Sequence, residues 1–151
     1  MIDAKGQART VEFNCRLGDP EAEVILMRLK SDLFEVLMQA ADGALDKVEL
    51  QWDRRTALGV VMAAAGYPAA PRKGDVISIG PAAEADDLKV FHAGTTRVDG
   101  PLSSSGGRVL CVTALGDSVR LAQQRAYEGV GAIRFDGAQW RSDIGHRAIR
   151  H

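Results

Sequence analysis

The 151-residue sequence is poor in cysteine and aromatic residues and carries almost no net charge. Its two cysteines, Cys15 and Cys111, are too few for a disulfide framework and lack the spacing of a zinc site. With 19 basic and 20 acidic residues, it has no positive excess for binding nucleic acid or an anionic membrane. Its apolar runs are far shorter than the ~20 residues of a membrane-spanning helix, and residues 1–10 lack the basic start and apolar stretch of a signal peptide. These absences predict a soluble, cytoplasmic protein with neither nucleic acid nor membrane as a partner.

The apolar residues that are present suffice for a folded core. They make up 46% of the chain, against 26% charged residues, which excludes a disordered tail. A chain of this length forms one domain, or two at most.

Two helices are expected in the first third of the chain. Asp19 offers an N-cap carboxylate, and Pro20 suits the first helical position. The apolar run 24–29 predicts a first helix that is buried on several sides. Ser31 can cap a second helix, which has one apolar face and ends near Gly43.

From residue 57 the pattern changes to short strands separated by glycine turns, and then to a helix. Asp117 is expected to cap this helix, whose apolar residues follow three- and four-residue steps from Val119 to Ile133. Gly129 and Gly131 weaken its end, by roughly 1 kcal/mol each relative to alanine. The pattern predicts an α+β protein in two parts joined near residue 50. The expected strands are 57–65, 76–79, 90–94 and 109–115.

The start of the chain predicts a hairpin whose second strand covers residues 10–15. Strand alternation places Glu12, Asn14 and Arg16 on one face, about 7 Å apart in succession, and Cys15 with the core residues on the other. Carboxylate and amide oxygens suit Mg²⁺, and a guanidinium binds phosphate. The row predicts a site for a metal ion and phosphate, although a polar row is also typical of the wet face of an antiparallel sheet. The hairpin starts at residue 1 with no lead-in, which favours a chain cut from a longer one.

The sequence of residues 12–21, EFNCRLGDPE, resembles the signature of the glycinamide ribonucleotide synthetase (phosphoribosylamine-glycine ligase) family, which belongs to the ATP-grasp superfamily. The resemblance covers about residues 1–150. Leu17 departs from it, since the family usually has phenylalanine there, but the change is conservative. Further segments that resemble the family, in its order, are 30–33, 66–68, 74–77, 90–95, 106–110 and 143–145.

This resemblance implies a ligase reaction of purine biosynthesis. The family uses ATP to phosphorylate the carboxylate of glycine, and the amine of 5-phosphoribosylamine then attacks the glycyl phosphate. Carried over by the resemblance, Glu12 and Asn14 would bind the Mg²⁺ or Mn²⁺ ions at the ATP phosphates, and Arg16 would be the catalytic residue that neutralises the transferring phosphoryl group. Asp19 would lie near the substrate, or act only as a helix cap.

Arg108 is a candidate for binding the substrate's ribose phosphate, by analogy with related ATP-grasp enzymes. It follows Gly106 and Gly107, which have no side chains to keep a phosphate from the backbone. A turn followed by an exposed strand residue would give the same pattern. His92 lies on an apolar strand and is expected to be a core residue rather than a catalyst.

The sequence lacks parts that an ATP-grasp ligase needs. It has no glycine-rich loop followed by a phosphate-binding lysine, so most of the ATP pocket is expected upstream of residue 1. We therefore expect residues 1–50 to be the last segment of the ATP-grasp domain, a hairpin with helices. Residues 51–151 would form the small C-terminal domain, with a mixed or antiparallel sheet and a helix. Without the N-terminal domains, this chain is expected to be inactive.

Three other functions stay open. The chain could be a non-catalytic module that binds a phosphosugar through Arg108 or serves as an interaction domain. It could belong to another ATP-grasp enzyme of purine synthesis. A Mg²⁺-dependent hydrolase that uses Glu12 and Asn14 is disfavoured, because the row offers one carboxylate only.

Overall fold

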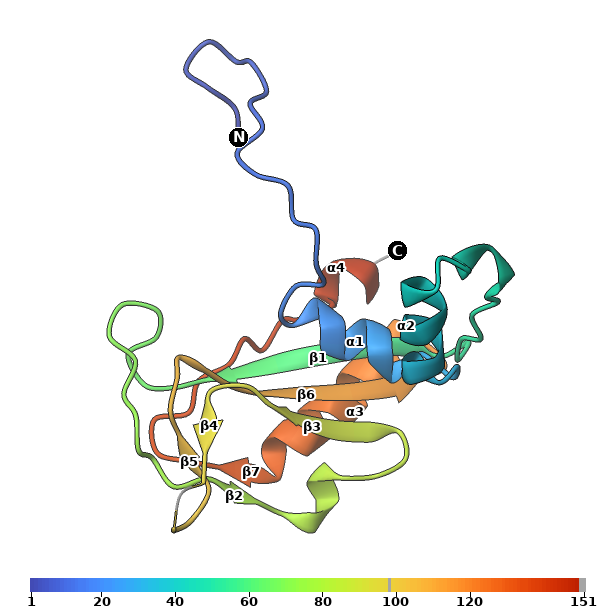
Figure 1. Ribbon diagram of the computed structural model, residues 1–151. Helices are drawn as coiled ribbons and strands as arrows, with labels where there is room; N and C mark the ends of the chain where they lie inside the picture. Colours follow the sequence, from blue (N-terminus) through green and yellow to red (C-terminus); the bar gives the residue numbers. More distant parts are fainter. Residues whose placement is uncertain (98, 150–151) are drawn as a thin grey trace.

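A three-stranded antiparallel sheet lies between helices in the computed structural model, which describes residues 1–97 and 99–149 (Figure 1). Its central strand is β6 (Arg108–Gly116), which pairs with β1 (Thr56–Ala63) on one side and β3 (Leu88–His92) on the other. Helix α3 (Val119–Gly131) packs on one face, and α1 (Glu21–Met27) packs on the other. The predicted α+β class is confirmed.

The remaining elements are short. The strand β2 (Ser78–Ile79) pairs with β7 (Ile133–Arg134), and β4 (Thr95–Thr96) pairs with β5 (Ser103–Ser104), both antiparallel. In chain order the elements are α2 (Leu33–Ala41), η1 (Leu45–Lys47), β2 (Ser78–Ile79), η2 (Pro81–Ala83), β4 (Thr95–Thr96), β5 (Ser103–Ser104), β7 (Ile133–Arg134) and α4 (His146–Ile149).

The core forms where α3 covers the sheet. Residues 109–115 of β6 are each at most 5% exposed, because both faces of this strand are covered. The buried face of α3 carries Ala122, Ala126 and Val130, at the predicted spacing. These small side chains let the helix lie close to the strands, and a Cβ on Gly129 would lie only 2.8 Å from the Val112 side chain.

The first 17 residues differ from the prediction. Ile2 and Ala8 form one isolated antiparallel bridge. Residues 10–15, all of them described, lie outside any strand and extend away from the sheet in Figure 1. The predicted strand is therefore wrong for this structure, because a strand needs a neighbour to pair its backbone groups. Residues 10–15 have no such neighbour on the exposed arm formed by residues 1–19. Cys15, predicted to join the core, is exposed for the same reason.

Two of the predicted helix caps are displaced by one residue. The side chain of Asp32, not Ser31, caps α2 and accepts a hydrogen bond from the Phe34 backbone N–H at 2.8 Å. The Ser31 hydroxyl accepts instead from a backbone N–H twenty residues further along the chain, at 2.8 Å. Similarly, Ser118 caps α3, not Asp117. An N-cap residue has an extended backbone, and its side-chain oxygen accepts a hydrogen bond from the first turn of the helix. The sequence cannot show which of two adjacent polar residues has this backbone conformation.

Helix α1 packs less deeply than predicted. All seven of its residues keep some exposure, so burial of 24–29 on several sides is wrong. One face lies on the sheet, where the Val24 side chain lies close over Gly59. The Asp19 carboxylate caps no N–H of this helix and faces Arg108 instead. No helix within the described residues is long and apolar enough to cross a membrane.

Candidate functional site

The predicted metal and phosphate residues lie on the exposed arm. Glu12, Asn14 and Arg16 are all exposed. The Asn14 side-chain oxygen accepts a hydrogen bond from the Arg16 backbone N–H at 3.2 Å, and the Arg16 guanidinium donates to the Leu17 carbonyl at 3.0 Å. These are local contacts, so the structure does not bring the row together with the other predicted residues.

The donor set of the arm fits a hard cation only in part. Glu12 and Asn14 supply one carboxylate and one amide oxygen, and a Mg²⁺ ion commonly takes few protein ligands besides phosphate oxygens. Within residues 1–97 and 99–149, no three His, Cys, Asp or Glu side chains form a group that could hold a metal ion by themselves. The remaining ligands of such an ion would have to come from the nucleotide and from other residues.

Asp19 and Arg108, 89 positions apart, are brought into contact. The Arg108 Nη1 donates to the Asp19 carbonyl at 3.1 Å, and its Nη2 lies 3.4 Å from the Asp19 carboxylate. Both side chains remain nearly half exposed, at 43% and 45%. The contact links the end of the arm to the first residue of β6 and orients the Arg108 guanidinium.

Gly107 is a glycine for a reason that the sequence does not show. A Cβ atom on Gly107 would lie 2.4 Å from Cδ2 of Tyr67, so the Tyr67 ring occupies the space beside the glycine. Nearby, a Cβ on Gly94 would lie 2.7 Å from the Arg108 carbonyl oxygen. The backbone before Arg108 is therefore closely packed, which fixes the position of the Arg108 backbone.

A hollow of about 370 Å³ lies beside Arg108. The Gln139 side chain at its wall donates to the carbonyls of Ala64 and Tyr67, at 2.7 and 3.2 Å. The backbone of Gln139 pairs with Ala63 at the end of β1, which holds the last part of the chain against the sheet. The hollow is lined by Val61, Ala63, Tyr67, Arg108, Gln139, Trp140 and Arg141.

A second arginine at this hollow is also held in place. Arg141 donates from Nε and Nη2 to the two carboxylate oxygens of Asp143, at 2.9 and 2.7 Å. These hydrogen bonds lower the pKa of Asp143 and raise that of Arg141. Tyr67, Gln139 and Arg141 were not predicted as site residues, because nothing in the order of residues shows that 61–67 and 139–141 meet.

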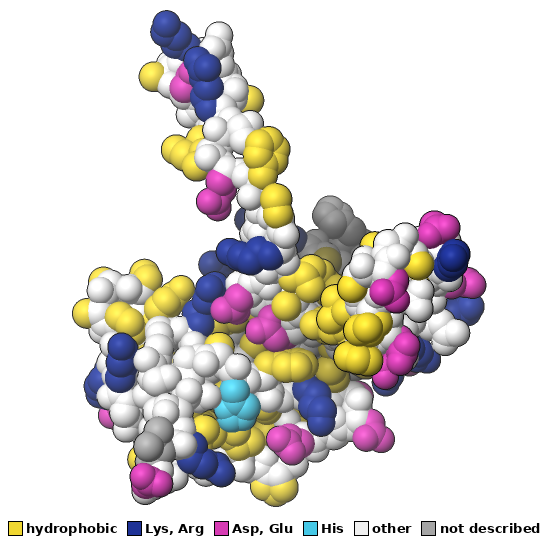
Figure 2. All heavy atoms as spheres, viewed as in Figure 1, with side chains coloured by type: hydrophobic (Ala, Val, Ile, Leu, Met, Phe, Trp, Pro, Cys, Tyr) yellow, Lys and Arg dark blue, Asp and Glu magenta, His cyan; other side chains and the backbone are white. Residues whose placement is uncertain are grey.

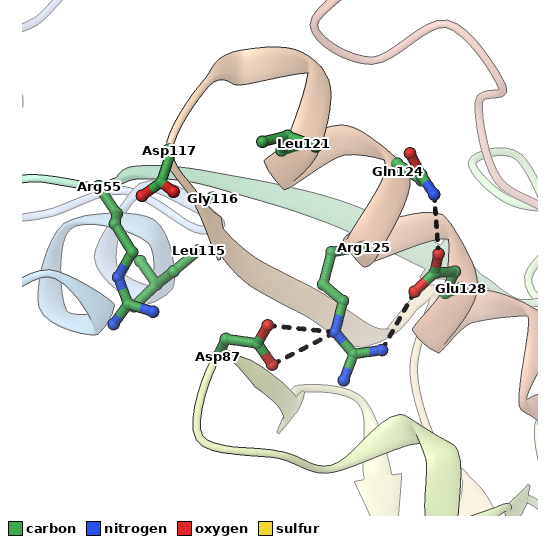
Figure 3. Close-up of a pocket in the computed structure, with 9 residues that line it drawn as sticks. All are labelled: Arg55, Asp87, Leu115, Gly116, Asp117, Leu121, Gln124, Arg125 and Glu128. Atoms are coloured by element: carbon green, nitrogen blue, oxygen red, sulfur yellow. Dashed lines mark hydrogen bonds and ion pairs between the residues drawn. The ribbon is translucent and has the colours of Figure 1, made fainter.

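A second hollow, of about 290 Å³, lies at the opposite end of β6 (Figure 3). In it, Arg125 contacts both Asp87 and Glu128 at 3.2 Å, and Gln124 donates to Glu128 at 3.1 Å. These charged groups pair with one another, and none of the predicted site residues lines this hollow. The hollow at Arg108 is therefore the better candidate for a ligand-binding site.

His92 is not the core residue that was predicted. It is exposed at the end of β3, and its Nδ1 lies 3.1 Å from the Thr95 hydroxyl. It neither lines the hollow at Arg108 nor belongs to the arm.

Comparison with known proteins gives a consistent family. Residues 57–147 match the family "Phosphoribosylglycinamide synthetase, C domain". The phosphoribosylamine--glycine ligase of Ralstonia nicotianae is 63% identical over 150 residues, and that of Vibrio vulnificus strain YJ016 is 56% identical over 149. Each alignment covers 99% of this chain but 35% of the relative, so the chain spans about 35% of the length of these proteins.

A solved structure agrees with these sequence matches. The crystal structure of phosphoribosylamine--glycine ligase from Thermotoga maritima superimposes with a TM-score of 0.75 at 34% identity. The match covers 95% of this chain and 35% of that one.

Proposed function

The chain belongs to the phosphoribosylglycinamide synthetase family, and we propose that it is the C-terminal part of a cytoplasmic, ATP-dependent ligase of purine biosynthesis, which joins glycine to 5-phosphoribosylamine. The observation that carries this proposal is the 63% identity over 150 residues with the phosphoribosylamine--glycine ligase of Ralstonia nicotianae. The aligned length includes the arm with residues 12–21 as well as Arg108, so it extends beyond the matched C domain, 57–147.

The proposed reaction has two steps. The glycine carboxylate attacks the γ-phosphorus of ATP, which releases ADP and gives glycyl phosphate. The amine of phosphoribosylamine then attacks the acyl carbon, and phosphate leaves. Such reactions depend mainly on positioning and on neutralising the charge of the phosphoryl group.

The arm supplies groups of the required chemistry. We assign Arg16 to the transferring phosphoryl group, because a guanidinium keeps its charge and offers paired N–H donors. Glu12 and Asn14 would hold Mg²⁺ or Mn²⁺ together with ATP oxygens, and the ion would supply positive charge at the phosphates. In this chain alone these side chains are exposed, so other parts of the enzyme would have to close over them.

The substrate's phosphate is assigned to Arg108. Its contact with Asp19 leaves N–H groups unused and the side chain 43% exposed. Asp19 then acts by holding the guanidinium, and Gly107 acts by leaving room for Tyr67 at the wall of the hollow. These roles place the three residues at one end of β6.

Two units follow from this proposal. Residues 1–50 would belong to the ATP-grasp domain, and residues 51–151 would form the C domain, whose last two residues lie outside the described part. The family match beginning at residue 57 and the sheet beginning at Thr56 support a boundary near residue 50.

A turnover assay tests the proposal. The chain alone and the chain extended by the coding sequence upstream of residue 1 are each given ATP, glycine, phosphoribosylamine and Mg²⁺, and ADP formation is measured. We expect ADP only from the extended protein, and a loss of about 100-fold or more in kcat on Arg16→Ala. Arg9→Ala, on the same arm but outside the proposed row, is the matched control and should keep the rate.

Two results would contradict the proposal. Turnover by the chain alone would overturn the division of the site between units. An extended protein that forms no ADP with these substrates would overturn the ligase assignment.

A second candidate is a module that only binds phosphosugars. This function is favoured because Arg108 lines a hollow whose lining includes none of Glu12, Asn14 and Arg16. Two measurements identify such a module. Calorimetry should show that the chain binds ribose 5-phosphate equally with and without Mg²⁺, and the turnover assay should show no ligase activity in the extended protein.

A further inference from the structure

The hollow beside Arg108 contains more than a phosphate site requires. Tyr67 and Trp140 line it and are 39% and 43% exposed. Val61 and Ala63 add aliphatic surface from β1. Aromatic rings that stay exposed in a concave surface offer a flat apolar face to a ligand, with apolar contact that a phosphate cannot use.

The charged groups of the hollow are oriented before any ligand arrives. Asp19 holds Arg108, and Asp143 holds Arg141 through two hydrogen bonds. Each guanidinium keeps N–H groups that these partners do not use, because it has five donors. An anion bound beside either guanidinium would meet donors that need no large rearrangement.

The size of the hollow fits a small organic ligand. Its volume, about 370 Å³, lies near the lower end of the range usual for such pockets. A ligand that uses both features must combine an anion with a planar ring. A nucleoside 5′-monophosphate does so, since its phosphate suits arginine and its base stacks on an aromatic side chain.

We propose that this hollow binds a nucleoside 5′-monophosphate, with the phosphate at Arg108 and Arg141 and the base against Trp140. The inference rests on the anion-binding role proposed for Arg108. It adds that a finished nucleotide competes with phosphoribosylamine, because both carry a ribose 5-phosphate group.

Tryptophan fluorescence tests this on the chain as it stands. The chain has two tryptophans, and Trp52 lies away from this hollow, so Trp52→Phe leaves Trp140 as the reporter. The probes are AMP, ribose 5-phosphate, adenosine and inorganic phosphate. We expect a saturable change with AMP, and an affinity about tenfold higher for AMP than for ribose 5-phosphate.

Three variants, followed by calorimetry, assign the contacts. Arg108→Ala should weaken AMP and ribose 5-phosphate alike, by about tenfold or more. Trp140→Leu should weaken AMP to the level of ribose 5-phosphate and leave ribose 5-phosphate unchanged, whereas Trp140→Phe should keep the preference for AMP. Thermal melting of each variant shows that it is folded.

The outcomes separate this inference from the proposed function. Equal affinity for AMP and ribose 5-phosphate would overturn the inference and leave Arg108 as a phosphate ligand. AMP binding that survives both Arg108→Ala and Trp140→Leu would place the nucleotide elsewhere and overturn it too. Binding of neither AMP nor ribose 5-phosphate would overturn the inference together with the role of Arg108, while the turnover assay would still decide the ligase assignment.

Discussion

Cys111 shows how position alone determines the chemistry of a side chain. It is buried in β6 beneath α1, with its Sγ 3.5 Å from the Thr113 hydroxyl. Burial raises the pKa of its thiol to about 11, above the usual value near 8.5. The predicted packing role is confirmed for Cys111, while Cys15, predicted to pack as well, lies exposed on the arm.

The raised pKa predicts a loss of stability in alkali. The unfolded chain loses the Cys111 proton above about pH 8.5, whereas the folded chain keeps it to about pH 11. The folded state thus binds more protons in this interval, so the thiol's contribution to the free energy of unfolding is complete below pH 8.5 and falls as the pH rises. Urea unfolding between pH 7 and 10.5 measures this change.

Cys111→Ala is the control for the other groups that titrate in alkali. The difference in unfolding free energy between the natural protein and this variant should shrink steadily above pH 8.5. A difference that stays constant to pH 10.5 would show that the Cys111 thiol is not the titrating group.

At the scale of residues, the sequence singled out individual side chains but not the partners that they contact. Arg108 and Asp19 were both singled out, but their contact spans 89 positions and no local pattern shows it. Gly107 was interpreted as a place for a phosphate, whereas the Tyr67 ring fills the space beside it. Long-range contacts of this kind depend on the assembled fold.

At the scale of elements, the two glycines near the end of α3 are not equivalent. The sequence treats Gly129 and Gly131 alike, as weak points of a helix. In the structure, a Cβ on Gly129 would lie 2.8 Å from Val112 and 3.0 Å from Leu88, whereas a Cβ on Gly131 would meet nothing within 4 Å. Gly129 is therefore needed for the helix to lie close to the sheet.

Alanine at each position gives opposite predictions. Gly129→Ala should lower the free energy of unfolding by about 1–3 kcal/mol, because overpacking outweighs the better helix propensity. Gly131→Ala should change it little or raise it, by up to about 1 kcal/mol. Chemical denaturation of both variants measures the pair, and a stabilised Gly129→Ala protein would contradict the close packing.

The sequence predicted the sheet well and the arm poorly, for one physical reason. The sequences of β1 and β6 are nearly continuous apolar runs. Such runs are typical of strands that are buried on both faces, so they are easy to predict. Residues 10–15 alternate as a strand should, but alternation cannot supply the neighbouring strand that pairing needs. Predicted strands thus form only where a partner strand is present.

At the scale of the whole molecule, a large apolar surface stays uncovered. Figure 2 shows hydrophobic side chains gathered over α2, with more along the arm. Phe13 is 85% exposed, Phe34 64% and Leu37 58%. Such an extent of apolar surface marks a contact with another protein surface.

We expect the isolated chain to self-associate through this surface. Sedimentation velocity over a range of concentrations should show dimers or larger species, and Phe34→Glu with Leu37→Glu should shift them to monomer. Leu121→Glu is the matched control, since Leu121 is 50% exposed on α3, away from α2, and should change nothing. A natural chain that is monomeric at every concentration would contradict this expectation.

Residues 139–141, in the last segment of the chain, contribute both to the sheet edge and to the hollow at Arg108. Gln139 pairs with the outer edge of β1 at Ala63, and residues 139–141 also form one wall of the hollow at Arg108. A proteolytic cut just ahead of Gln139 would therefore leave most of the sheet and its α3 packing in place, and it should abolish the ligand binding proposed for the hollow at Arg108. A cleaved sample would then pass a test of folding and fail a test of the proposed binding, and measuring the intact mass would distinguish it from an uncleaved sample.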